Sequence, residues 1–427
     1  MKKAIVVGTG AGGATAAKEL QGAYDVTLLE AGRDFQPFAT DLSLAEKVKK
    51  TGLMFDEREI QLLFPAMKIR KTEDHMVLVN GIGLGGTTTV ATGNAVRVDD
   101  RLKEFGINLD EEFEELYREI PISTDHQKRW RKTTRRLFDL CGEMGLRPQA
   151  LPKMGDNQKC TNCGHCVLGC PYGAKWDSRV FVSDALKKGA TLKTGCKVEE
   201  VVTEDGTAVG VRLRKGLRSE YLSSDLVVLA AGGFGTPAIL EQSGIKCERR
   251  LFVDPVLCVG AEWKGALQNR EISMPFVMER NGYILAPYFD YLSFFFNKDW
   301  KYPSDDTLSI MIKVADSDDG GVSGKKIEKT LSDDDRGKLI EGVESCYDIL
   351  EEFGANKQTL FLGTVNAGHP GGMVPLTREE ASTFHSSRLP SNLYVADASL
   401  FPSSLGKPPM LTIMAMAKRI GKLCSLN

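Results

Sequence analysis

A glycine-rich turn close to the N-terminus restricts the fold of this chain more than any other feature of its sequence. The turn reads Gly8-Thr-Gly-Ala-Gly-Gly13 and lies between an apolar run at residues 3–8 and residues that favour a helix up to Leu20. A second apolar run at residues 25–30 predicts another strand, so we expect the chain to begin with a βαβ unit. In such a unit Gly8 permits the tight turn, Gly10 lets the backbone approach a pyrophosphate, and Gly13 lets the helix pack closely on the sheet.

The position of these glycines, between a predicted strand and a predicted helix, is the context that a dinucleotide-binding turn requires. Glu30 ends the second predicted strand, where its carboxylate can accept hydrogen bonds from both hydroxyls of a ribose. The N-terminus of the helix adds free N–H groups and a partial positive charge for the phosphates. The sequence therefore predicts a bound dinucleotide, against the alternative of a glycine-rich turn without a ligand. This unit alone does not distinguish NAD from FAD.

Length and charge narrow the class of protein further. At 427 residues the chain is expected to form two intergrown domains, and its formal net charge of −2 gives no electrostatic case for binding nucleic acid. No apolar run approaches the roughly 20 residues that cross a bilayer. Met-Lys-Lys at the N-terminus passes directly into the first predicted strand, which leaves no room for the apolar part of a signal peptide. We therefore expect a cytoplasmic protein without a membrane span.

Four of the ten cysteines lie within eleven residues and predict a metal centre. They are spaced C-x2-C-x2-C-x3-C-P, the run typical of ferredoxins, and the expected ligands are Cys160, Cys163, Cys166 and Cys170. In ferredoxins with two clusters the fourth cysteine of such a run binds the other cluster, so either Cys170 or a distant thiol such as Cys196 completes the set here. The pattern favours a [4Fe–4S] cluster. A [3Fe–4S] cluster and a tetrahedral zinc site are the alternatives.

Several later segments resemble the glucose–methanol–choline (GMC) oxidoreductases in content and in order. They are Gly81-Ile-Gly-Leu-Gly-Gly86-Thr-Thr, Ala230-Ala-Gly-Gly-Phe-Gly-Thr-Pro237, Asn392-Leu-Tyr-Val-Ala-Asp397-Ala-Ser-Leu-Phe-Pro402 and Pro409-Met-Leu-Thr-Ile-Met-Ala-Met-Ala-Lys418. The resemblance covers most of the chain and is weakest at residues 36–77 and about 250–310. Some members of that family carry a cysteine-rich insertion before a stretch similar to Tyr172-Gly-Ala-Lys175, which indicates the iron–sulfur-containing subgroup.

The resemblance implies an α+β fold, in which an α/β FAD-binding Rossmann-like domain with the βαβ start is joined to a smaller β-rich substrate domain. The FAD-binding domain is expected to be discontinuous, with segments 1–35, 78–124, 180–255 and 365–427. A cysteine-rich iron–sulfur insertion would occupy residues 125–179, and the substrate domain would occupy residues 256–364.

The resemblance also implies which residues contact FAD. Gly85, Gly86 and Thr87 would lie along the flavin and its diphosphate, Val198 would meet the adenine, and Asp397 would lie by the ribityl and diphosphate groups. Ala231 and Gly232, in the second segment, would also border the cofactor. Pro409 and Met410 would place a helix N-terminus at the pyrimidine edge of the flavin, where it stabilises the negative charge of the reduced ring. No histidine or cysteine matches a covalent attachment site, so the FAD is expected to be non-covalent.

His369 is the candidate acid/base residue. It lies in Asn366-Ala-Gly-His-Pro-Gly-Gly372, which resembles a segment of cholesterol-oxidase-like members whose histidine faces the reactive end of the flavin. A near-neutral histidine suits the removal of a hydroxyl proton. A structural role in a glycine-rich loop is the alternative. The family usually places a second His or Asn where this chain has Pro408, which has no side-chain donor, so Asn366 or a substrate-domain side chain is expected to position the hydroxyl.

Together these features predict an FAD-dependent dehydrogenase that oxidises a CH–OH group or reduces the matching carbonyl. The small-molecule substrate would be an alcohol or a carbonyl compound, and electrons would pass through the cluster to an external carrier: a ferredoxin-like protein, a cytochrome or a partner subunit. An electron-transfer flavoprotein subunit without alcohol chemistry is the main alternative, and a zinc-stabilised flavin oxidase is another.

Some local signals add detail. Asp205-Gly206 predicts a hairpin turn, Ser332 and Gly354 predict the two ends of a helix, and residues 128–141 favour a helix with a basic face. That basic face is either solvated or a dock for an acidic electron carrier. The aromatic residues between Tyr283 and Tyr302 line a pocket or, as the alternative, pack in a sheet core.

Overall fold

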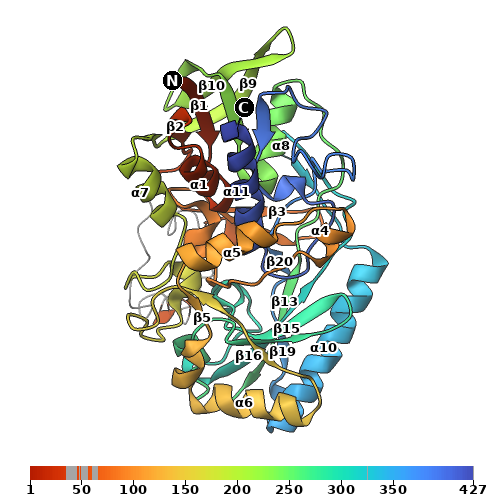
Figure 1. Ribbon diagram of the computed structural model, residues 1–427. Coiled ribbons are helices and arrows are strands. Elements are labelled where there is room, and N and C mark those ends of the chain that lie inside the picture. Colours follow the sequence, from red (N-terminus) through yellow and green to blue (C-terminus); the bar gives the residue numbers. More distant parts are fainter. Residues whose placement is uncertain (35–45, 48, 50–55, 60–65, 325, 427) are drawn as a thin grey trace.

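The computed structural model describes residues 1–34, 46–47, 49, 56–59, 66–324 and 326–426. In Figure 1 the first strands and helices and the C-terminal helix form one half of the molecule, and a sheet with a long helix forms the other half. Segments from both ends of the chain lie together in the first half. The mixture of a parallel and a mixed sheet with helices confirms the predicted α+β fold class.

A parallel sheet forms the centre of the first half. Its strands, in the order β21-β12-β1-β2-β8, are Leu393–Val395, Leu226–Leu229, Lys2–Val7, Tyr24–Leu29 and Thr191–Lys193. Strand β12 and the last four residues of β1 are apolar and buried, because α1 and the antiparallel sheet of residues 196–223 both pack on this sheet. Helix α1 (Ala11–Glu19) packs on the strands themselves. Helices α7 (Arg179–Lys187) and α11 (Met410–Leu426) pack on α1, α5 (Asp110–Glu119) packs on α11, and α8 (Gly232–Gln242) follows β12. The βαβ unit predicted from the first thirty residues is therefore confirmed.

An antiparallel sheet extends from the same half. It consists of β9 (Cys196–Glu204), β10 (Thr207–Lys215) and β11 (Arg218–Ser223). The turn between β9 and β10 is the predicted one, with Asp205 and Gly206 at φ values of 48° and 75°. Two consecutive positive φ angles match the right-handed twist of the strands.

A mixed sheet forms the second half. In the order β3-β4-β20-β13-β16-β15-β14-β6, its strands are Met67–Lys71, Val77–Gly81, Asn366–Ala367, Val256–Glu262, Thr307–Val314, Tyr283–Pro287, Phe276–Glu279 and Gln149–Ala150, and β19 (Phe361–Leu362) also pairs with β13. One face packs on α10 (Asp333–Phe353) and α6 (Lys132–Glu143). Ser332 caps α10 with a capping box, and Gly354 ends it in the left-handed conformation, as predicted.

The single helix predicted for residues 128–141 is wrong in one respect. A 3-10 turn at Asp125–Arg129 precedes α6, and the chain is extended at Arg131 between them. The break occurs because the Arg131 N–H donates to Glu271 at 2.7 Å, while the Trp130 indole donates to His126 at 2.9 Å. The tertiary contact to Glu271, which follows the 3-10 turn Gln268–Arg270, thus overrides the local helical preference.

The cysteine-rich region joins the two halves. Its strand β7 (Lys153–Met154) pairs with β5 (Ile122–Ser123), and its strand β6 extends the mixed sheet. The domain boundaries given above remain a proposal, and the limits at residues 35 and 427 lie outside the described residues. None of the helices in the described ranges combines the length and the apolar character needed to cross a membrane.

Candidate active site

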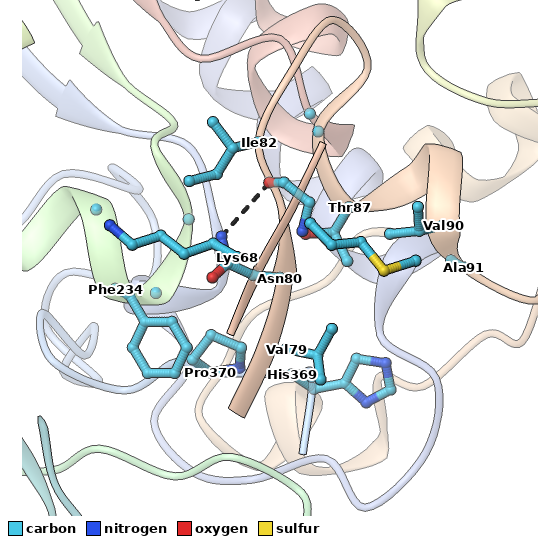
Figure 2. Close-up of a pocket in the computed structure, with 18 of the residues that line it drawn as sticks. Lys68, Val79, Asn80, Ile82, Thr87, Val90, Ala91, Phe234, His369 and Pro370 are labelled. Carbon is cyan, nitrogen blue, oxygen red and sulfur yellow. Dashed lines mark hydrogen bonds between the residues drawn. The ribbon is translucent and has the colours of Figure 1, made fainter. Parts of the chain in front are cut away.

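A cavity of about 1010 Å³ lies between the parallel sheet and the mixed sheet. Its wall includes the glycine-rich turn and Glu30 from the first half, and β3, β4 and the loop of His369 from the second half. Figure 2 shows His369 and Val79 at one part of this wall, with Pro370 beside Phe234 of α8. The cavity therefore joins the predicted nucleotide site and the predicted acid/base residue in one space.

The glycine-rich turn packs closely against its neighbours at Gly8 and Gly13 and leaves room for a ligand at Gly10. Gly8 has a φ of 99°, and a Cβ atom there would lie 2.3 Å from the carbonyl oxygen of Ala230. A Cβ at Gly13 would lie 2.0 Å from the carbonyl oxygen of Gly8, so this glycine serves the close packing of α1 and does not border the cavity. Gly10 borders the cavity, and a Cβ there would point to Gly86, whose Cα would be 4.0 Å away. This cradle of small residues fits a pyrophosphate.

Glu30 is buried beside the turn. Its Oε2 accepts hydrogen bonds from the Thr9 backbone N–H at 3.1 Å and the Thr9 hydroxyl at 2.7 Å. Its Oε1 accepts from the Gly32 N–H at 2.9 Å. The carboxylate is thus fixed at the cavity wall, where the predicted contact with a ribose would be made.

The segment after β4 forms a 3-10 turn, η2 (Gly86–Val90), that faces the glycine-rich turn. Gly85 takes a φ of 94° and donates its N–H to the Thr9 hydroxyl at 3.1 Å, so it supports the turn from behind and does not line the cavity. Gly86 and Thr87 do line it. The structure therefore brings two sequence-distant glycine-rich segments together around the space expected to hold the diphosphate.

Most of the other predicted FAD contacts also border the cavity. They are Val198, Ala231, Gly232, Asp397, Pro409 and Met410. Asp397 accepts hydrogen bonds from the Gly232 N–H at 2.8 Å and the Thr236 hydroxyl at 2.5 Å. Burial raises the pKa of Asp397, and these hydrogen bonds act against that rise. The donor set, the glycine cradle and the size of the cavity fit FAD.

His369 lies at the part of the wall contributed by the mixed sheet. Its side chain is 31% exposed, whereas Nδ1 is buried and lies 3.4 Å from Oδ2 of Asp254. The side chain borders the cavity, and because Nδ1 is buried, Nε2 is the ring nitrogen that is available to a ligand. Burial lowers the pKa of His369, and the charge of Lys313 lowers it further. A neutral imidazole with one edge toward the cavity can accept a proton.

Sequence reasoning missed the two charged residues behind His369. Lys313 lies on β16 and forms an ion pair with Asp254, and both side chains are almost completely buried. Lys313 and Asn366 lie in the same row of the mixed sheet, each paired with Val256, and both border the cavity. Asn366 donates its amide to the Thr364 carbonyl at 3.0 Å. The signal for Lys313 was a single cation within the apolar strand Thr307–Val314.

The four cysteines of the run line a second, smaller pocket. Within the described ranges no three His, Cys, Asp or Glu side chains converge where an ion could bind, so the thiols share a pocket without forming a ready-made ligand set. Cys170 lines this pocket with the other three thiols, whereas Cys196 lines the large cavity. Of the two expected fourth ligands, the arrangement favours Cys170.

Two lysines border the cysteine pocket. Lys153 is buried and donates to the Ser273 carbonyl at 2.5 Å and to Asn94. Lys175 donates to the carbonyls of Thr88, Thr89, Ala91 and Cys166 at 2.7 to 3.2 Å. Neither forms an ion pair with a carboxylate of the described residues. Burial lowers the pKa of Lys153 to about 7, and the nearby thiols oppose this effect.

The basic and aromatic runs have mixed roles. Arg129, Arg131 and Arg136 donate to the carbonyls of Cys160, Arg270 and Phe353, so much of the basic run stabilises loops. Tyr288, Tyr291, Phe295 and Phe296 border the large cavity, whereas Phe289, Phe294 and Trp300 pack in the core beside them.

Comparisons with known proteins agree with this geometry. Residues 2–264 match the N-terminal part of the GMC oxidoreductase family, and residues 312–417 match its C-terminal part. The chain belongs to the GMC oxidoreductase family. The chain is 23% identical over 418 residues to the uncharacterized protein MJ1450 of Methanocaldococcus jannaschii, covering 97% of each chain. It is 25% identical to the long-chain-alcohol oxidase FAO1 of Arabidopsis thaliana, where the match covers 97% of this chain and 65% of that protein.

Solved structures of the same family share the fold. A pyridoxine 4-oxidase from Mesorbium loti superposes with a TM-score of 0.74 at 15% identity, over 99% of this chain and 98% of that one. A formate oxidase from Aspergillus oryzae RIB40 superposes with a TM-score of 0.72 at 15% identity, over 100% and 98%. At this level of identity the likeness establishes the fold alone.

Proposed function

We propose that this GMC oxidoreductase is an FAD-dependent dehydrogenase that oxidises a CH–OH group, or reduces the matching carbonyl, and exchanges electrons with an external carrier. The observation that carries the proposal is the continuous cavity, which runs from the glycine-rich turn to His369. Family membership and the cradle of Gly10 and Gly86 support FAD as the cofactor. The substrate would be a small alcohol or carbonyl compound that enters between the aromatic side chains near His369 and the mixed sheet.

The chain's own residues would handle the proton. Nε2 of His369 would take the hydroxyl proton while the C–O single bond of the alcohol becomes the C=O double bond of the carbonyl. When bound, FAD supplies the acceptor for the hydrogen that leaves the carbinol carbon with two electrons. Asn366, whose side chain borders the same space, would hold the hydroxyl oxygen. Tyr288 and Phe296 would exclude water from the reacting carbon.

We further propose that Cys160, Cys163, Cys166 and Cys170 hold an iron–sulfur cluster, most simply [4Fe–4S]. The spacing of the cysteines and their shared pocket support this assignment. The two lysines at the pocket support it as well. A buried ammonium without a carboxylate partner is costly, and an anionic cluster would offset the charges of Lys153 and Lys175. When bound, such a cluster accepts electrons one at a time.

The position of the cysteine pocket supports an exchange of electrons with the cavity. Thr92 borders both the main cavity and the cysteine pocket. Lys175 donates hydrogen bonds to the Thr89 carbonyl of η2 and to the Cys166 carbonyl. A ferredoxin-like protein, a cytochrome or a partner subunit would then receive the electrons. The alternative is an electron-transfer flavoprotein subunit without alcohol chemistry, and Pro408 at the cavity wall favours it because it offers no donor to a hydroxyl.

The test is anaerobic purification followed by measurement of FAD, iron, zinc and acid-labile sulfide, with EPR of the dithionite-reduced protein. About four irons and four sulfides per FAD, as expected for one [4Fe–4S] cluster, would support the two-cofactor dehydrogenase. One zinc without sulfide would remove the cluster from the proposal.

A second measurement separates the dehydrogenase from the electron-transfer subunit. The oxidised protein is mixed anaerobically with a panel of alcohols, including straight-chain alcohols of increasing length and pyridoxine, and flavin absorbance is followed. Bleaching by at least one alcohol, with little H2O2 in air, is the expected result. Bleaching by reduced ferredoxin but by no alcohol would favour the electron-transfer subunit.

A further inference from the structure

Asp254 occupies a position that connects the candidate base to two other parts of the fold. Its Oδ2 contacts Lys313 Nζ and lies 3.4 Å from His369 Nδ1, and its Oδ1 accepts a hydrogen bond from the Ser404 hydroxyl. Lys313 belongs to β16, His369 to the loop after β20, and Ser404 to the segment before α11. One carboxylate therefore holds together three elements that meet at the cavity wall.

The backbone at Asp254 is itself held in place. Asp254 has a φ of 54°, which a non-glycine residue adopts at an energetic cost, and its N–H donates to Asp316 at 2.8 Å. The Val253 N–H donates to the same carboxylate, and Lys329 pairs with Asp316 at 3.1 Å. These residues are buried. A second buried ion pair thus fixes the conformation that aims the Asp254 carboxylate at Lys313 and His369.

The charges at this point cancel in pairs. Burial opposes ionisation of Asp254, but Lys313 and His369 outweigh it and lower the pKa of Asp254 to about 2. Asp254 is therefore an anion. Burial lowers the pKa of Lys313, but the adjacent carboxylate opposes that effect, and Lys313 is the cation that compensates Asp254. A neutral His369 adds no charge. Lys313 borders the cavity, whereas Asp254 lies behind it and behind His369.

We propose that Lys313 and Asp254 are positioning residues for His369. Nδ1 of His369 makes no hydrogen bond with the described residues in this structure, and a small turn of the ring would let its N–H donate to Asp254 Oδ2, 3.4 Å away. That hydrogen bond fixes the tautomer with the Nε2 lone pair toward the cavity and stabilises the imidazolium once the substrate proton has moved to Nε2. Lys313 keeps Asp254 ionised, so the proton remains on His369.

This inference rests on the proposed function for the role of His369, but its test does not require an alcohol substrate. Sulfite is an anion that adds to oxidised flavin and bleaches its absorbance, so its affinity reports the charge beside the flavin. Removing Lys313 leaves the negative charge of Asp254 uncompensated. Removing the charge of Asp254 leaves the positive charge of Lys313. The two substitutions therefore change the local charge in opposite directions.

The experiment titrates FAD-loaded wild type, Lys313→Met, Asp254→Asn and the double variant with sulfite at one fixed pH. Lys313→Met is expected to weaken sulfite binding by about tenfold or more, the effect of one unit charge over several ångströms at an effective dielectric constant near 20. Asp254→Asn is expected to strengthen it by a similar factor. The double variant, which replaces the buried pair with two neutral side chains, should return to near the wild-type value, and it is the variant expected to fold most readily.

The matched control is Lys407→Met. Lys407 is a partly exposed lysine that pairs with Glu279 at 2.7 Å and does not line the cavity, so its loss should leave the sulfite affinity unchanged. Shifts of the two single variants in the same direction, or no shift in either, would overturn the inference. Opposite shifts with no alcohol able to bleach the flavin would retain the charged pair and reject the alcohol chemistry, so the two failures are distinguishable.

Discussion

The chemistry proposed here depends most on one residue, His369, and its environment predicts how activity varies with pH. Burial and the charge of Lys313 lower its pKa below the ordinary value of about 6.5. Because the neutral form is the base, kcat/KM for alcohol oxidation should rise through a pKa below 6.5 and stay level through neutral pH. His369→Asn should lower the rate of flavin bleaching by about 10²- to 10⁴-fold while FAD remains bound. Anaerobic stopped-flow measurements from pH 5 to pH 8 would check both.

The charged neighbours of His369 determine in which direction the acid limb of the pH profile moves when they are substituted. Lys313 disfavours the imidazolium, so Lys313→Met should move the acid limb of the profile to higher pH. Asp254 favours the imidazolium, so Asp254→Asn should move the limb to lower pH. A profile that keeps its wild-type limb in both variants would show that neither residue acts on His369. Lys407→Met serves again as the control, because that lysine lies outside the cavity wall.

The sequence predicted His369 as the candidate base but did not predict the two residues behind it. His369 was found because it lies in a recognisable segment, whereas Asp254 and Lys313 are separated by 59 residues and belong to no motif. The sequence marks Lys313 only by its being a cation within an apolar strand, and it was not predicted as a site residue. Its partner could not be named from the sequence, because the contact depends on the register of β13 beside β16 and on the unusual backbone of Asp254.

At the scale of the elements, the glycine-rich turn offers a matched pair of substitutions. Gly10 has ordinary negative φ, and its nearest neighbour to a built Cβ is 4.0 Å away, so Gly10→Ala should fold normally. The added methyl points into the space expected to hold the pyrophosphate, so FAD affinity should fall about tenfold or more, an unfavourable change of about 1.4 kcal/mol or greater. Flavin fluorescence titration of the apoprotein would measure it.

Gly12→Ala, in the same glycine-rich turn, is expected to have a different effect. A Cβ at Gly12 would lie 1.6 Å from the Ala396 carbonyl oxygen, so α1 could no longer pack on the end of β21. This variant should lose stability as well as FAD. Gly337→Ala, on the exposed face of α10 with no atom near the built Cβ, should change neither FAD binding nor folding adversely. Wild-type FAD affinity in Gly10→Ala would contradict the proposed location of the pyrophosphate.

The predicted elements were correct where a local signal was strong. The βαβ start, the Asp205-Gly206 turn and both ends of α10 follow from residues that act within a few positions of themselves. The helix expected at residues 128–141 divides at Arg131 because a carboxylate 140 residues away, Glu271, binds its N–H. Such a contact has no local signature. Some aromatic residues between Tyr283 and Tyr302 pack in the core and others line the cavity. Which of them do so likewise depends on the sheet that this segment joins.

The cysteine segment leads to another prediction at this scale. A cluster with bound thiolates carries negative charge, and its reduced form carries more, so a nearby cation stabilises reduction. Lys153→Met should therefore lower the reduction potential of the cluster, measured by EPR during a redox titration. Lys132→Met, an exposed lysine on α6, is the control. An unchanged potential in Lys153→Met at full iron content would show that Lys153 does not act on the cluster.

At the scale of the whole molecule, the main cavity lies where the two halves of the chain meet. Gly10 and Asp397 reach it from the parallel-sheet half, whereas Lys313 and Asn366 reach it from the mixed sheet. Residues from near both ends of the chain thus contribute to one space, and the family matches at 2–264 and 312–417 together cover both halves. A ligand that fills this space is expected to hold the halves together.

FAD should therefore stabilise the whole fold, by an amount that grows with its free concentration. Binding at 100 times Kd contributes about 2.7 kcal/mol. The unfolding entropy near 60 °C is about 2.1 cal/mol/K per residue, or roughly 0.9 kcal/mol/K for a chain of this size, so Tm should rise by about 3 °C over the apoprotein. Differential scanning calorimetry at increasing FAD would measure this, with Gly10→Ala requiring more FAD for the same rise. A Tm independent of FAD in a protein that binds it would mean that the cofactor contacts only a part that unfolds before the main transition, because a ligand released at that stage cannot raise the temperature at which the halves separate.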